Sequence, residues 1–119
     1  MAQPETAQLE VCRRFGVQPM APEPNELVGI ARNIRSGLLP LQGMRYLPEE
    51  AGCGWLLWAG DEPGEDDDFF QPMHVSHLAE WAPDLVPYLA LLPGWRFLIA
   101  PGYEDVWFDD ALLDPSEYE

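Results

Sequence analysis

Prolines and glycines interrupt this chain at short intervals. The sequence has 119 residues, of which 13 are proline and 10 are glycine. Both residue types disfavour helix interiors and central strands, so they predict short elements joined by many turns. An apolar content of 47% and five tryptophans nevertheless favour a packed core over disorder. We expect a single domain over residues 1–119, with an N-terminal helix and a proline-rich connector in residues 1–25 and an acidic tail in residues 114–119.

Helical periodicity predicts three short helices: residues 6–15, residues 75–81 and a further one that begins at Pro83. In the first, Leu9, Cys12 and Phe15 form a stripe that we expect to face the core. Thr6 is the expected N-cap of this helix, and Gly16 is expected to end it.

Apolar runs predict the strands. Cys53–Ala59 is the clearest, because it is apolar on both faces, which is typical of a central strand. The other expected strands are Leu27–Ala31, an irregular one around Leu38 and Leu39, Met44–Leu47, Trp95–Ala100 and its hairpin partner Asp105–Asp109. The expected class is therefore α+β, a mostly antiparallel sheet with helices packed on one face.

Negative charge is concentrated in the second half of the chain. Residues 1–60 hold six carboxylates and five arginines, whereas residues 61–119 hold fifteen carboxylates and Arg96. The formal net charge is −15, and there is no lysine. Such a field repels nucleic acid and anionic membranes and attracts a basic partner.

The densest acidic run, residues 61–68, admits three interpretations. A calcium site is one, but the run lacks the central glycine and the closing glutamate of a twelve-residue calcium loop. A solvated loop is the second, and a docking surface for a basic protein is the third. On a strand, Trp107 points the same way as Asp105 and Asp109, which suits an arginine or lysine of a partner. The expected partner contacts are Asp61, Glu62, Glu65, Asp66, Asp67, Asp68, Glu104, Asp105, Trp107, Asp109 and Asp110.

No residues in the sequence form a recognisable catalytic or cofactor site. His74 and His77 are spaced i, i+3, whereas zinc favours i, i+4 pairs with a third ligand, so we expect no metal. A nucleophilic pair of Cys12 or Cys53 with a histidine is also disfavoured, because Cys53 starts a buried strand. Two alternatives stay open: a small metal-dependent hydrolase that uses His74, His77 and the acidic run, and an acidic adaptor or nucleic-acid mimic.

The two cysteines also bear on the compartment. Cys12 and Cys53 have no metal spacing and are interpreted as free thiols in a reducing environment. The N-terminus lacks the features of a signal peptide, and no apolar run reaches the ~20 residues of a membrane span. We expect a soluble cytoplasmic protein.

Several short motifs occur in one order along the chain. They are Gly54-Trp55 with Ala59-Gly60-Asp61-Glu62, Asp67-Asp68-Phe69-Phe70, His74-Val75 with His77-Leu78, Trp81-Ala82-Pro83, Pro93-Gly94-Trp95-Arg96-Phe97 and Tyr103-Glu104-Asp105-Val106-Trp107. Together, from about Phe15 to Leu113, they resemble immunity protein family 33, formerly a domain of unknown function. This family is found beside bacterial polymorphic toxins, including type VI secretion effectors. The resemblance implies a small cytoplasmic α+β protein that binds and neutralises a cognate toxin, with no catalytic residues and no cofactor.

Overall fold

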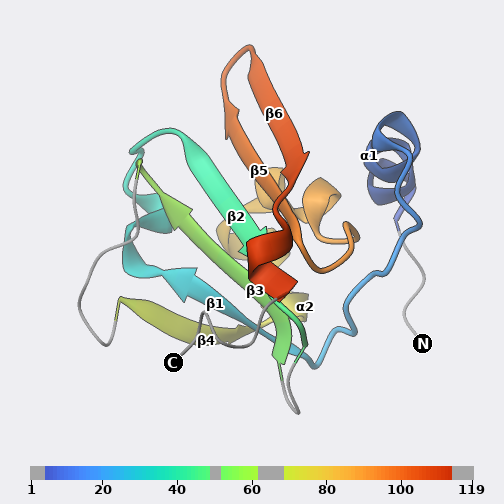
Figure 1. Cartoon of the computed structure of the whole chain (residues 1–119). Coiled ribbons are helices and arrows are strands. Elements are labelled where there is room, and N and C mark those ends of the chain that lie inside the picture. The colour runs from blue at the N-terminus through green and yellow to red at the C-terminus, as the bar shows by residue number, and fades with distance from the viewer. Residues whose placement is uncertain (1–4, 49–51, 62–68, 114–119) are drawn as a thin grey trace.

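A six-stranded sheet forms the protein, with two α-helices and the 3₁₀ helix of residues 83–88 packed on one side and the short 3₁₀ helix of residues 110–113 in front of the other (Figure 1). The computed structural model describes residues 5–48, 52–61 and 69–113. The strand order is β4-β1-β3-β2-β5-β6, and β1 with β3 is a parallel pair beside four antiparallel ones. This architecture confirms the expected α+β class. The elements are α1 (Thr6–Phe15), β1 (Leu27–Ala31), η1 (Arg32–Arg35), β2 (Leu41–Arg45), β3 (Gly52–Ala59), β4 (Phe70–His74), α2 (Val75–Trp81), η2 (Pro83–Tyr88), β5 (Trp95–Ala100), β6 (Tyr103–Phe108) and η3 (Asp110–Leu113), where η marks a short 3₁₀ helix.

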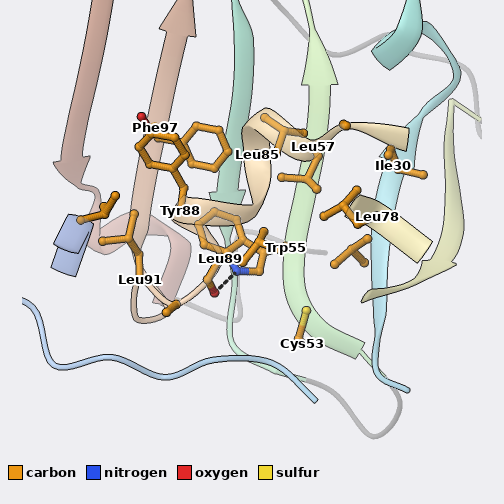
Figure 2. Packing of buried hydrophobic residues seen from close by; sticks show 14 of the residues in the cluster. Ile30, Cys53, Trp55, Leu57, Leu78, Leu85, Tyr88, Leu89, Leu91 and Phe97 are labelled. Carbon is orange, nitrogen blue, oxygen red and sulfur yellow. Dashed lines mark hydrogen bonds between the residues drawn. The ribbon is translucent and has the colours of Figure 1, made fainter. Parts of the chain in front are cut away.

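The core lies between the sheet and the helices. Trp55 and Leu57 of β3 are fully buried, as expected for a central strand. Figure 2 shows how Leu78 of α2 and Leu85 of η2 pack against this face. The Trp55 indole N–H donates a hydrogen bond of 2.9 Å to the carbonyl of Leu89. The only polar atom of this large side chain is therefore satisfied inside the core.

A buried arginine connects loop segments to the sheet by hydrogen bonds to their backbone carbonyls. Arg45 of β2 is 1% exposed. Its Nε donates to the carbonyl of Cys53 at 2.9 Å, and its Nη1 donates to three further carbonyls. These belong to Met20 at 2.8 Å, Leu89 at 3.2 Å and Leu91 at 2.8 Å. Burial lowers the pKa of the guanidinium from its ordinary value. The sequence pattern places Arg45 on a strand but does not indicate this role.

Helix α1 has the predicted bounds, and two residues of the predicted stripe face the core, because Cys12 is buried and Phe15 packs against the core cluster. Leu9 is 46% exposed, whereas Gln8, Val11 and Cys12 are buried. Gln8 is tolerated inside because its Nε2 donates to the carbonyl of Val86 at 2.9 Å and its Oε1 accepts from the Glu5 N–H at 2.9 Å. The N-cap is accordingly Glu5 and not Thr6, and Gly16 ends the helix as predicted.

The segment before β2 differs from the prediction. The expected strand around Leu38 and Leu39 is absent from this described stretch, where both leucines are about half exposed. The chain instead forms η1, a bend and a cis peptide bond before Pro40, and β2 starts at Leu41. An adjacent pair of leucines favours a strand, but here both side chains lie on the surface.

Strand β4 was not predicted. It pairs antiparallel with β1 at the edge of the sheet, with Leu27 opposite His74 and Ala31 opposite Phe70. Its side chains are half-buried or exposed, and it contains Pro72, which is tolerated on an edge strand. Among the described residues, none of the helices has the length and apolar character needed to cross a membrane.

Candidate partner-binding surface

Four strands share one end of the sheet with the start of the acidic run. Ala59 pairs with Leu41, Leu41 pairs with Ile99, and Ile99 pairs with Glu104. We call this region the hairpin end; it comprises residues 36–41, 59–61 and 99–105. The run of carboxylates that follows β3 therefore leaves the sheet at the same end as the β5–β6 turn.

The backbone at the start of the acidic run is held in place by β2 and by the residue that precedes it. Gln42 Nε2 donates hydrogen bonds of 2.8 Å to the carbonyls of both Gly60 and Asp61. The Gly60 N–H donates to the carbonyl of Pro40 at 2.8 Å. Gly60 has a φ of 97°, a conformation that favours glycine, which accounts for glycine directly before the acidic run. The predicted contact residues Glu62, Glu65, Asp66, Asp67 and Asp68 lie outside the described residues.

Glu104 lies on the helix-covered face of the sheet and is paired within the chain. Its carboxylate accepts two hydrogen bonds from Arg14 of α1, at 2.6 and 3.0 Å, and one from the Tyr88 hydroxyl of η2. The hydrogen bond from Arg14 is the main reason that the pKa of Glu104 is lowered. Burial, followed by the bond to Glu104, raises the pKa of Tyr88. Glu104 thus connects β6 to two helices.

Asp105, Trp107 and Asp109 lie on the opposite face, as the strand alternation predicts. Trp107 is directly opposite Arg96 of β5, whose guanidinium lies 5.3 Å from the indole centroid. Arg96 Nη1 also lies 3.2 Å from the Asp109 carboxylate. The position that the sequence suggested for a cation of a partner is therefore already occupied by an arginine of this chain.

The four predicted contact carboxylates in and after β6 are consequently divided between the two ends of that strand. Glu104 and Asp105 lie at the hairpin end but on opposite faces, whereas Asp109 and Asp110 follow the far end of β6. Among the described contact candidates, only Asp61, Glu104 and Asp105 lie at the hairpin end.

Sequence reasoning missed the apolar side chains at the hairpin end. Leu38, Leu39 and Tyr103 are 51%, 48% and 56% exposed. The available signal was their position in segments rich in glycine and proline, which favour surface turns over buried strands. These three residues add apolar contact area beside the carboxylates.

The two histidines lie close together on the surface. His74 and His77 are both exposed, and their ring centroids are 5.8 Å apart. Within residues 5–48, 52–61 and 69–113, no three side chains of the metal-binding types form a group that could hold an ion. The described residues therefore give the hydrolase alternative no third ligand.

Comparison with known families gives one match. The family model of the Imm33-like domain matches residues 7–109. The chain belongs to the Imm33-like domain family. Searches of curated proteins and of solved structures returned no match. The match confirms the resemblance noted from the sequence motifs.

Several motif residues of this Imm33-like domain serve the fold. Gly54 has a φ of 97°, and a Cβ atom there would lie 2.1 Å from the Tyr46 carbonyl oxygen. Gly94 joins two segments by backbone hydrogen bonds, both at 2.7 Å: its N–H donates to the carbonyl of Arg45, and its carbonyl accepts from the N–H of Asp109. Trp55 is part of the core. These three motif residues therefore support the architecture and are not candidates for partner contact.

Proposed function

We propose that this Imm33-like domain is an immunity protein that binds and neutralises a cognate secreted bacterial toxin. The observation that carries the proposal is a net charge of −15 in a chain that the immunity-family model matches over residues 7–109. Neutralisation is by stoichiometric binding and involves no turnover by the immunity protein. Its partner presents a basic surface, and neither nucleic acid nor a membrane is a partner.

The charge distribution suits a toxin that acts on nucleic acid in the cytoplasm. A nuclease must present cationic groups to phosphates, and an acidic surface complements them. Complementary charge also accelerates association, which matters for an inhibitor that must bind the toxin before the toxin acts. The residues proposed for contact are those of the acidic run together with the carboxylates of β6 and its neighbours.

The acidic run offers a direct test. Replacing Asp66, Asp67 and Asp68 together by lysine is expected to slow association with the toxin at least about tenfold and to weaken protection of cells. The toxin tested is the product of the neighbouring gene, with its active site inactivated for the binding measurement. A control variant with lysine at Glu49, Glu50 and Glu80 changes the net charge by the same amount. Equal association rates for parent and triple variant exclude the acidic run as contact surface, and an absence of any binding by the parent excludes the proposed function.

A further inference from the structure

A groove of about 490 Å³ opens at the hairpin end. It lies between the start of β2, helix η2 and the β5–β6 hairpin. Its apolar lining includes Leu39, Leu41, Ile99 and Tyr103, and two carboxylates, Asp84 and Glu104, also line it. Apolar and acidic side chains therefore meet in one concave surface.

The apolar part of the groove is accessible to a partner. Leu39 is 48% exposed and Tyr103 is 56% exposed. Large apolar and aromatic side chains that meet a partner inside a polar rim are typical of the residues that dominate binding energy at interfaces. In contrast, exposed apolar residues scattered singly need no explanation. Here they line one groove.

The two carboxylates of the groove differ in their contacts within the chain. Glu104 is held by Arg14 and by the hydroxyl of Tyr88, so this wall has a defined shape before any partner arrives. Asp84 is exposed at the first turn of η2 and has no ion-pair partner within the described part of the chain. A basic group of a partner would supply the missing counter-charge.

We infer that this groove is the centre of the toxin-docking surface. The occupant is a toxin segment in which an apolar or aromatic side chain lies beside an arginine or lysine. The apolar side chain contacts Leu39 and Tyr103, and the cation pairs with Asp84. The inference rests on the proposed function and adds the location of the contact and the chemistry of the segment that fills it.

A second groove of the protein serves as the comparison. It has a volume of about 410 Å³ and lies on the sheet around Gly29, Gly54, Leu56 and Phe70. Its described lining contains no carboxylate, so no charge there selects a basic occupant. Leu47 at its margin is 42% exposed, which is close to the exposure of Leu39.

Matched truncations test the inference. Leu39→Ala combined with Tyr103→Ala is expected to raise the Kd for the inactivated toxin of the neighbouring gene at least about tenfold. The control, Leu9→Ala combined with Leu47→Ala, removes two side chains of similar exposure and is expected to change Kd less than about twofold. Asp84→Asn is expected to raise Kd about threefold to tenfold, whereas Glu80→Gln on α2 leaves it unchanged.

The outcomes separate the inference from the proposed function. If the parent binds the toxin and the groove variants bind equally well, the groove assignment is wrong and the proposed function stands. If the parent does not bind, both fail. Hydrogen exchange of the parent, free and toxin-bound, decides the case in which a groove variant does not fold. Protection of residues 38–41 and 99–104 supports the groove, and protection confined to other segments overturns it.

Discussion

Arg96 and Trp107 lie directly opposite each other on β5 and β6, and the guanidinium of Arg96 covers the indole at 5.3 Å from its centroid. The same arginine reaches the Asp109 carboxylate at 3.2 Å. Arg96 is the only arginine or lysine in the second half of the chain. It stabilises the β5–β6 hairpin by a contact of the kind that the sequence suggested for a partner.

We expect Arg96→Met to lower the free energy of unfolding by no more than about 1 kcal/mol. The two charged side chains are 25% and 29% exposed, so solvent weakens their attraction. In addition, the buried Nε of Arg96 has no hydrogen-bond partner among the described residues, which offsets part of the gain. Urea unfolding of parent and variant measures the difference. A loss of several kcal/mol would show that this contact contributes more than its exposure allows.

Arg45, unlike Arg96, is expected to contribute strongly to the free energy of unfolding. Its guanidinium is buried and donates to four carbonyls, of Cys53, Met20, Leu89 and Leu91. Arg45→Met removes the guanidinium from all four carbonyls, of which that of Leu89 keeps its hydrogen bond from Trp55, and we expect a loss of about 3 kcal/mol or more. Arg45→Lys is expected to recover only part of this, because an ammonium cannot reproduce the planar geometry.

Urea unfolding also measures this effect, with Arg35→Met as the control. Arg35 lies on the surface beside Trp81, 5.0 Å from its ring centroid, and its removal is expected to cost less than about 1 kcal/mol. Equal losses for the Arg45 and Arg35 variants would contradict the role assigned to the buried guanidinium.

Ionisation of Glu104 is expected to make part of the free energy of unfolding depend on pH. Its pKa is lowered below the ordinary value of 4.5, mainly by the hydrogen bond from Arg14. The folded state therefore favours the ionised carboxylate, and this contribution is full above pH 4.5 and is lost as the pH falls through the lowered pKa. We expect Glu104→Gln to cost about 1 kcal/mol at neutral pH, a value reduced by partial solvent exposure.

The measurement is urea unfolding of parent and Glu104→Gln as a function of pH. Their difference is expected to be constant from neutral pH down to about 5 and to shrink under more acidic conditions. Asp105→Asn, on the same strand but the opposite face, serves as control and should show a smaller difference throughout. A difference between parent and Glu104→Gln that grows on acidification would reverse the assigned sign.

Local patterns were sufficient for much of the fold. Residues 6–15, 27–31, 75–81 and 95–100 were predicted with the bounds that the structure has, because periodicity, capping glycine and proline at a first turn act over short distances. Strand β4 was missed because its pairing with β1 is distant in sequence and its exposed side chains show no strong alternation. The leucines at 38 and 39 were misassigned because an apolar pair does not by itself indicate burial.

The parts of the candidate surface that depend on local sequence patterns were also predicted. Alternation along β6 placed Asp105, Trp107 and Asp109 on one face, since the period of a strand is local. That Arg96 lies opposite Trp107 depends on the register of the hairpin, which the strand period alone does not determine. The groove could not be predicted, because Leu39, Asp84 and Tyr103 come from three separate segments that only the tertiary fold brings together.

Both cysteines are expected to be unreactive in the folded protein. Cys12 and Cys53 are free thiols with 1% and 0% exposure, and burial raises the pKa of each. Attack on a disulfide reagent requires an accessible thiolate, so labelling of the native protein should follow transient unfolding and be at least about a hundredfold slower than in denaturant. Timed reaction with a chromogenic disulfide measures both rates, and Cys53→Ser isolates the signal of Cys12. Rapid labelling of either thiol under native conditions would mean that its side of the core opens without global unfolding, which the packing of α1 and β3 argues against.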